Sequence, residues 1–355
     1  MKKQNHGYIL IVTLLMIASM TAIGTYIYLR STVFLPFMRT VYDREKAKML
    51  ALGGLQIAIQ QLSQFDAPES EQPAASPQTG GQPAKPKEAG GPPQLFARLM
   101  PIINRWQKFP LQKNIDGIDG SIQVCLVCEE GKINLNRIYD FDKGQFRNQG
   151  QLKGDWQKLM GLVCKEIEQA RGGKELLPAL EGFLKNRGYP LYDITELLTI
   201  KEFDVFRNHI FYEPEAKKTD DKPNIYLTDL FTTFSDKSTI EPRLFSHSML
   251  SILKLAHNAS AEQIATMKQN FKQTVQWPSD WETQLKPLYE KDFQSLFTGL
   301  ESALSTQFNP QQFSVLVHGT VGAVTQRLLA IVTRNKRARN GETRYNTAIS
   351  RIYWL

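Results

Sequence analysis

Residues 8–29 read Y-I-L-I-V-T-L-L-M-I-A-S-M-T-A-I-G-T-Y-I-Y-L, and none of these 22 residues carries a charge. At about 1.5 Å per residue, a helix of this length crosses the roughly 30 Å hydrocarbon core of a bilayer. The apolar core of a secretory signal peptide is shorter, about 7–15 residues, and no convincing A-x-A-like cleavage site follows this stretch. The stretch therefore predicts one transmembrane helix, with a removed signal peptide as the alternative interpretation.

The helical pattern continues beyond the apolar stretch. Its apolar stripe is formed by Leu52, Leu55, Ile59 and Leu62, a spacing typical of one face of a helix. We therefore expect a single helix over residues 8–65. Pro36 lacks a backbone donor, which predicts a kink or a local break near residues 32–36.

Residues 66–93 differ in composition from the rest of the chain. They consist almost entirely of Pro, Gly, Ala, Gln and charged residues and contain no large apolar side chain. Such a segment cannot bury a core, so the sequence predicts a disordered linker here.

Two regions with strand patterns flank a long helical section. The first covers about 115–136, and the second covers about 313–355 with turn residues near 335–342. Between them, residues 156–304 have helical spacing and few strand-like runs. The simplest interpretation is a helical module inserted into a sheet domain.

The composition points away from enzymes and disulfide-rich proteins. The chain of 355 residues has 43 Lys+Arg against 35 Asp+Glu, a net charge of +8, and contains no nucleotide-binding, zinc-binding or nucleophile-elbow motif. Cys125 and Cys128 have C-x-x-C spacing, but they lie in a strand-like run where residues three apart point to opposite faces. They are therefore not expected to share a metal or a disulfide, and we expect a non-enzymatic protein.

Several motifs carry a resemblance to a known family. Residues 1–7, M-K-K-Q-N-H-G, resemble a type IV prepilin leader, and 128–136, C-E-E-G-K-I-N-L-N, are similar to a strand motif of the type II secretion minor pseudopilin K family (general secretion pathway protein K). Further similar segments are R-E-K-A-K-M-L-A-L-G-G-L in 44–55, D-I-T-E-L-L-T-I-K-E-F in 193–203, and the final I-Y-W-L. Residues 180–188 and 238–253 depart from the family pattern.

The resemblance implies an α+β fold: a long N-terminal transmembrane helix and a pilin-like antiparallel sheet domain with a large inserted all-helical (SAM-like) module. The implied divisions are a leader (1–7), the pilin helix (8–65), the linker (66–93), a pilin-like α/β domain (94–147 and 308–355) and the inserted helical domain (148–307).

The resemblance also identifies candidate site residues. A prepilin peptidase would cut after Gly7, so that Tyr8 becomes the first mature residue and is methylated. Val12 then stands at the fifth mature position, where most pilins have Glu. The most specific family motif consists of Gly131, Lys132, Ile133, Asn134, Leu135 and Asn136. Some family members bind calcium, which makes Glu129 and Glu130 weak calcium candidates, although two solvated acids are the favoured interpretation.

The implied function is that of a minor pseudopilin that caps or initiates the pseudopilus tip for export of folded proteins. Implied partners are the I- and J-type minor pseudopilins, the major pseudopilin, the inner-membrane assembly platform and prepilin peptidase. Alternatives are a minor pilin of a type IV or competence pilus and a bitopic nucleic-acid receptor. Nucleic acid is disfavoured, because the basic residues are mostly dispersed and the one dense block, near residues 334–344, is interpreted as a solvated hairpin rim.

Membrane orientation rests on two conflicting indications. The span is preceded by Lys2 and Lys3 and followed closely by five basic residues, so the positive-inside rule would place the body in the cytoplasm. The family resemblance implies the opposite: a single-pass inner-membrane protein with a cytoplasmic N-terminus and a periplasmic body. We adopt the second orientation as the prediction.

Overall fold

The computed structural model describes residues 6–64, 92–148, 155–213, 224–257, 259–339 and 342–355. Residues 1–5 of the predicted leader and nearly all of the predicted linker lie outside the described residues. The last two linker residues, Pro92 and Pro93, begin helix α2 (Pro92–Leu99).

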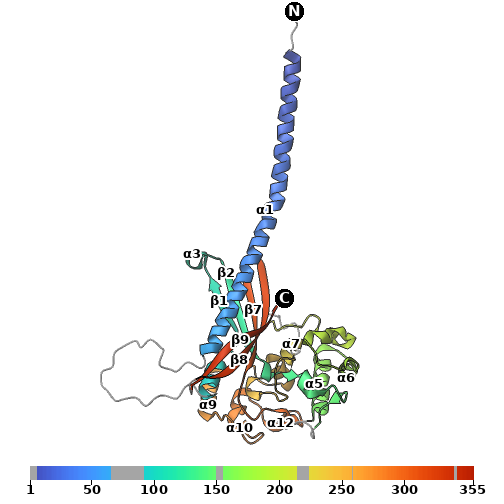
Figure 1. Cartoon of the computed structure of the whole chain (residues 1–355), viewed down its shortest axis with the longest axis vertical. Helices are drawn as coiled ribbons and strands as arrows, with labels where there is room; N and C mark the ends of the chain where they lie inside the picture. Colours follow the sequence, from blue (N-terminus) through green and yellow to red (C-terminus); the bar gives the residue numbers. More distant parts are fainter. Residues whose placement is uncertain (1–5, 65–91, 149–154, 214–223, 258, 340–341) are drawn as a thin grey trace, which may run out of the picture.

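The predicted N-terminal helix is confirmed as α1 (His6–Gln64), which projects far from the body in Figure 1. Pro36 lies inside it without interrupting it, so the predicted local break is wrong. Pro36 removes only one backbone donor, and the neighbouring turns keep their own hydrogen bonds. The Thr40 hydroxyl also donates to the Pro36 carbonyl oxygen at 3.0 Å.

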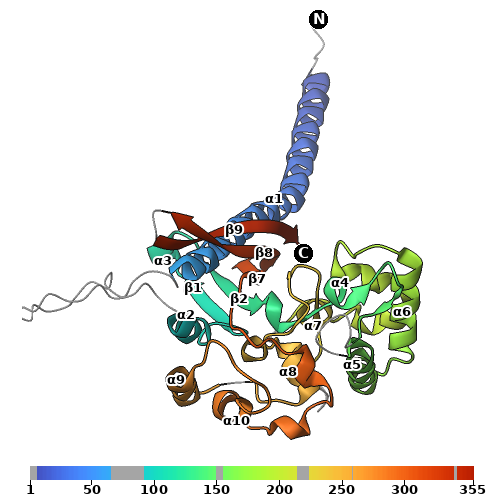
Figure 2. The same ribbon diagram turned by 60° about the horizontal axis from the view of Figure 1, so that its bottom comes forward.

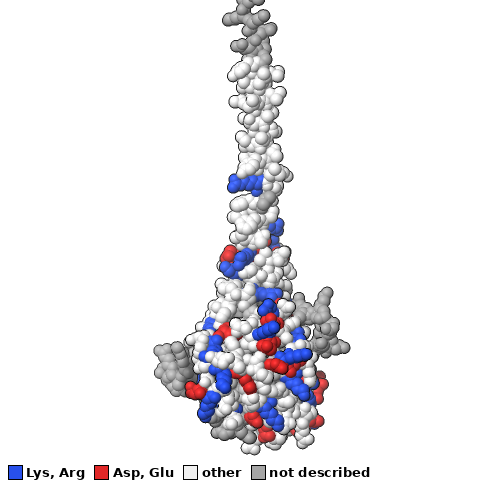
Figure 3. Space-filling model, turned by 90° about the vertical axis from the view of Figure 1, so that its right-hand side faces the viewer, with Lys and Arg blue, Asp and Glu red and all other residues white. Residues whose placement is uncertain are grey.

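The two halves of α1 have opposite environments. The exposed large apolar side chains from Tyr8 to Tyr42 range from 39% to 73% exposed, and Figure 3 shows this part as an almost uncharged rod. Ala47, Ala51 and Leu55, by contrast, are at most 1% exposed because they pack on the sheet. One helix therefore joins an uncovered apolar segment to a folded body.

The sheet confirms the predicted antiparallel arrangement. It has the strand order β1-β2-β7-β8-β9, with every neighbouring pair antiparallel. Its strands are β1 (Trp106–Leu111), β2 (Gly120–Cys128), β7 (Gln312–Val321), β8 (Val324–Arg339) and β9 (Glu342–Trp354). Because β2 pairs with β7, the residues on either side of the long helical section become neighbours.

Strand β1 lies outside the predicted strand regions. Its sequence W-Q-K-F-P-L is short and includes Pro110, which argues against a central strand. At the edge of the sheet, however, the missing N–H of a proline can be tolerated, and Pro110 pairs there with Ser121. The α3 turn (Lys113–Asp116) follows and ends at Gly117, which has a φ of 75°.

The two cysteines of the C-x-x-C pattern occupy opposite faces of β2, as predicted. Cys128 packs in the cluster that includes α1, whereas Cys125 packs with Val127 and Leu316 on the other face. Both cysteines are buried and neither forms a disulfide.

The predicted helical insertion is observed between β2 and β7, and Figures 1 and 2 place most of it at and beside the end of the sheet farthest from the N-terminus of α1. A short connection comes first, with η2 (Glu129–Gly131), β3 (Ile133–Asn134), α4 (Leu135–Ile138), β4 (Tyr139–Asp140) and β5 (Gln145–Phe146). The helical elements are α5 (Trp156–Arg171), α6 (Leu176–Arg187), η3 (Ile194–Thr199), η4 (Lys201–Phe206), α7 (Leu227–Leu230), η5 (Pro242–Leu244), α8 (His247–Leu253), α9 (Ala261–Asn270), α10 (Trp281–Gln284), α11 (Lys286–Tyr289), η6 (Phe293–Ser295) and α12 (Leu300–Ala303).

The insertion is not purely helical. It contributes β6 (Phe231–Thr232), which pairs in parallel with β3. One continuous hydrophobic cluster extends from α1 through the sheet into the insertion. The insertion is therefore joined to the sheet by both backbone pairing and shared core.

The basic block lies on the β8–β9 hairpin, as predicted, but Arg334 is only 3% exposed. The interpretation of a solvated rim is therefore wrong for Arg334. The backbone N–H of Arg334 donates to the Gln311 carbonyl oxygen at 2.7 Å, so this residue lies next to the segment that leads into β7.

Candidate functional site

The motif Gly131–Asn136 forms a compact turn between the sheet and the insertion. It was expected to be a strand, but only Ile133 and Asn134 are in strand conformation, between the turn η2 and the helix α4. The backbone of the Leu244 region passes so close that a Cβ on Gly131 would lie 1.8 Å from the Leu244 carbonyl oxygen. Only glycine fits at position 131, because any side chain there would clash with the backbone of Leu244.

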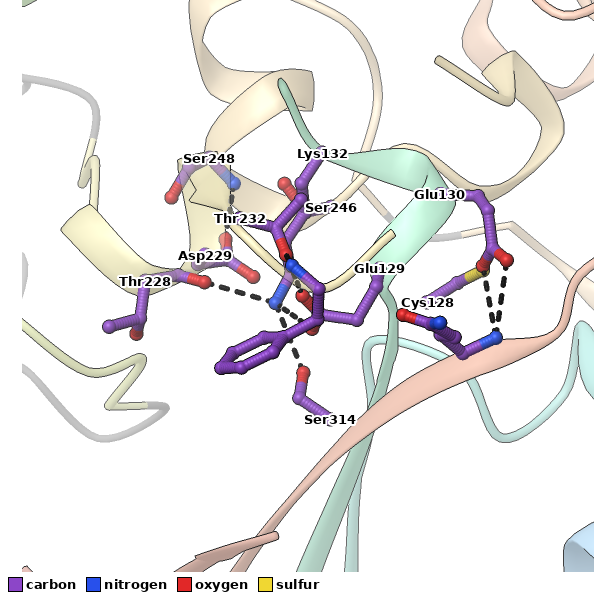
Figure 4. Close-up of polar contacts among 12 residues, drawn as sticks. Cys128, Glu129, Glu130, Lys132, Thr228, Asp229, Thr232, Ser246, Ser248 and Ser314 are labelled. Carbon is purple, nitrogen blue, oxygen red and sulfur yellow. Dashed lines mark hydrogen bonds and ion pairs between the residues drawn. The ribbon is translucent and has the colours of Figure 1, made fainter. Parts of the chain in front are cut away.

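Glu129 and Lys132 form a buried ion pair, with side chains that are 2% and 4% exposed. Lys132 Nζ donates to Glu129 Oε1 at 2.5 Å, to the Thr228 carbonyl oxygen at 3.0 Å and to Ser314 Oγ at 3.0 Å. These contacts converge in Figure 4. The expectation of two solvated acids is thus wrong: Glu129 is buried and both its oxygens accept hydrogen bonds, one from the nearby Lys132 and the other from the hydroxyl of the distant Thr232.

Glu130 is equally buried and connects the turn to the start of β7. Its Oε1 accepts the backbone N–H groups of Gln311 at 2.9 Å and Gln312 at 3.2 Å, and its Oε2 accepts the Cys128 thiol at 3.1 Å. Burial raises the pKa of Glu130, although these hydrogen bonds oppose the rise. Among the described residues no group of three or more His, Cys, Asp or Glu could hold a metal, so we base no calcium site on Glu129 and Glu130.

The remaining motif residues alternate between core and polar contacts. Ile133 and Leu135 are fully buried. Asn134 donates to the Ser235 carbonyl oxygen, whereas Asn136 donates to the Leu191 carbonyl oxygen and accepts the Leu191 N–H, both at 2.8 Å. The motif therefore holds two loops of the insertion against the end of the sheet.

A cavity of about 390 Å³ lies between the insertion and the sheet face opposite α1. Cys125, Leu316 and Leu329 form its floor on the sheet, and the insertion supplies aromatic side chains such as Phe211, Tyr212, Phe231 and Phe234. The Glu129–Lys132 pair and Asp229 also line it. Its volume falls in the range of small-molecule sites, about 300–1,000 Å³.

Asp229 lines this cavity and has one side-chain oxygen without a hydrogen-bond partner among the described residues. It is 3% exposed, its Oδ2 accepts the Ser248 N–H at 2.6 Å, and its Oδ1 has no hydrogen-bond partner among the described residues. Burial raises the pKa of Asp229, while the Lys132 ammonium opposes that rise. Asp229 was not identified in the sequence, because an isolated Asp in a Leu-Thr-Asp-Leu run carries no signal of burial.

The residues predicted to be processed lie far from this cavity, at the start of α1. Gly7 is in the first turn of the helix, Tyr8 is 72% exposed and Val12 is 39% exposed. The structure therefore contains two separate candidate regions: the exposed segment of α1, and the cavity with its polar wall.

The structure contains a second buried ion pair that was not predicted from the sequence. Arg243 donates from Nε to Glu241 Oε1 at 2.6 Å and from Nη2 to Oε2 at 3.0 Å, and its guanidinium lies 4.9 Å from the Phe308 ring centre. The pair is in residues 238–253, one of the segments that depart from the family pattern. The Glu-Pro-Arg order could have indicated it, since Glu241 caps the turn η5.

No family model and no curated protein matches this chain. Among solved structures, a chain in the crystal structure of the GspK-GspI-GspJ complex from the enterotoxigenic Escherichia coli type 2 secretion system is similar at 13% identity. The match covers 92% of this chain and 99% of that chain, with a TM-score of 0.40.

Proposed function

We propose that this chain is a minor pseudopilin of a type II secretion system that caps or initiates the pseudopilus tip. The proposal rests on one observation: α1 is packed on the sheet over its C-terminal part and is apolar and uncovered over its N-terminal part. A subunit that is drawn from a membrane into a helical assembly needs both parts. The proposed role is structural rather than enzymatic.

The uncovered segment is longer than a membrane anchor requires. Tyr8 to Tyr42 extends for about 50 Å at about 1.5 Å per residue, whereas the hydrocarbon core is about 30 Å thick. Phe34, Leu35 and Phe37 follow Arg30, the first charged residue after the apolar stretch, and are 56–65% exposed. If Tyr8–Leu29 crosses the bilayer, these three side chains lie beyond its hydrocarbon core and favour contact with helices of neighbouring subunits.

Two features support a place at the tip. Most of the insertion lies at and beside the end of the sheet farthest from the N-terminus of α1, where it would obstruct a subunit stacked above (Figure 1). In addition, after cleavage at Gly7 the fifth mature residue is Val12, which cannot accept the N-terminal amine of a neighbour as a Glu would.

Processing is the first test. Co-expressed with a prepilin peptidase, the mature protein should begin at a methylated Tyr8, and Gly7→Leu should block cleavage because a bulky side chain replaces the glycine at the cut. N-terminal sequencing and mass spectrometry measure both. Gly24→Leu is the matched control and should be cleaved normally, since nothing lies within 4 Å of a Cβ at Gly24. The proposal would be contradicted if the protein kept Met1 in the presence of active peptidase, or if the mature protein began beyond residue 25.

Assembly is the second test. Phe37→Glu should leave the free energy of unfolding within about 0.5 kcal/mol of wild type, because Phe37 is 63% exposed. It should nevertheless reduce co-purification with I- and J-type pseudopilins about tenfold or more, because a charge would be buried between helices.

Met49→Glu serves as the control for Phe37→Glu. Met49 is on the same helix and is 73% exposed, but it lies among charged residues next to the body. Co-purification should be close to that of wild type. Equal co-purification of the Phe37→Glu variant would mean that the uncovered segment of α1 does not contact other subunits.

A further inference from the structure

The cavity opposite α1 has the walls of a ligand site. Phe211, Tyr212, Phe231 and Phe234 supply aromatic surface from the insertion, and Leu316 and Leu329 supply aliphatic surface from the sheet. Its volume of about 390 Å³ is many times the roughly 10–15 Å³ that a single water needs. An apolar ligand body of drug-like size fits such a space.

The charges that line the cavity are unbalanced. Glu129, Asp193 and Asp229 contribute three carboxyl groups, whereas Lys132 contributes one ammonium group. That ammonium already donates to three acceptors, including Glu129, and Asp193 accepts the N–H and the hydroxyl of Thr195. Asp229 is left with a buried oxygen that has no partner among the described residues.

We propose that this cavity binds an organic cation carried on an apolar stem, with the ammonium or guanidinium group beside the Asp229 carboxyl group, whose side chain turns to present Oδ1 to it, and the stem against the aromatic wall. The cation supplies the missing donor, since buried polar atoms are almost always hydrogen-bonded. The aromatic faces add favourable cation–π contact. A free amphipathic amine and the Lys or Arg side chain of a bound protein share this chemistry. The proposal does not depend on the role assigned to α1.

The test uses the full chain in lipid nanodiscs and isothermal titration calorimetry, with empty nanodiscs subtracted. The probes are tryptamine, its neutral analogue tryptophol, and the capped peptide acetyl-Leu-Lys-Leu-amide. Tryptamine should bind saturably and about tenfold or more tighter than tryptophol, because a charge-assisted hydrogen bond is stronger than a neutral one. Tighter binding of the peptide than of tryptamine would identify a protein side chain as the natural ligand, and weaker binding a free amine.

Three variants distinguish a site from a water-filled space. Asp229→Asn keeps the acceptor for the Ser248 N–H and should remove the preference for tryptamine over tryptophol. Leu329→Trp should fill the cavity and abolish binding of both. Asp236→Asn, at a carboxylate that is 76% exposed, should bind as wild type does. Absence of saturable binding, or an unchanged tryptamine preference in Asp229→Asn, would overturn the proposal and leave a cavity that holds water only.

Discussion

Replacing Lys132 with methionine should lower the free energy of unfolding by about 3–5 kcal/mol, because it leaves the Glu129 carboxylate buried without its partner. The side chains of this pair are 4% and 2% exposed, so the carboxylate that is left behind stays buried. The same substitution removes a donor from Ser314 Oγ on β7 and from the Thr228 carbonyl oxygen in the insertion. Urea unfolding of the full chain in detergent, followed by tryptophan fluorescence, measures the change.

Two further variants identify the cause of that loss. Lys254→Met breaks an ion pair with Glu166 in which Lys254 is 66% exposed, and it should change the free energy of unfolding by at most about 1 kcal/mol. The double variant Lys132→Met with Glu129→Gln should recover a large part of the stability, because no uncompensated charge remains buried. If the double variant is as unstable as Lys132→Met alone, the loss comes from packing rather than from charge.

Replacing Gly319 with alanine should push α1 away from the sheet. It should lower the free energy of unfolding by about 3 kcal/mol, near the upper end of the range for overpacked cores. A Cβ at this position would lie 2.2 Å from the Ala47 carbonyl oxygen and 2.6 Å from the Ala51 amide nitrogen. These are backbone atoms of α1, so no change of side-chain rotamer relieves the clash. Thermal unfolding and protease sensitivity of α1 near Ala47 should both report the change.

Gly182→Ala is the matched control for Gly319→Ala. Gly182 lies inside α6, and nothing is within 4 Å of a Cβ built there. Alanine should therefore stabilise the protein by about 0.5–1 kcal/mol, through the higher helix propensity of alanine. A similar response of the two variants would show that close packing of α1 on β7 is not what constrains Gly319.

Features set by local pattern were predicted well. The length of α1 follows from its uncharged run and its apolar stripe, although its continuity through Pro36 was not predicted. The strands β7, β8 and β9 follow from their alternation and turn residues. The opposite faces of Cys125 and Cys128 follow from the two-residue period of a strand. Strand β1 was missed because its proline is acceptable only at an edge, and which strand forms the edge is decided by the whole sheet.

The sequence by itself determined the apolar N-terminal helix, the strand regions that become the sheet and the helical character of the insertion, because each depends on residues within a few positions of one another. Only the tertiary structure decided that Glu129, Glu130 and Arg334 are buried and that Asp229 lines a cavity. Lys132 is only three residues from Glu129 in the sequence, but the Thr232 hydroxyl that binds the other oxygen of Glu129 comes from 103 residues away. The amides that bind Glu130 come from 181 and 182 residues away. A charged side chain looks solvated in any local window, and it becomes buried only when folding brings a distant partner to satisfy it.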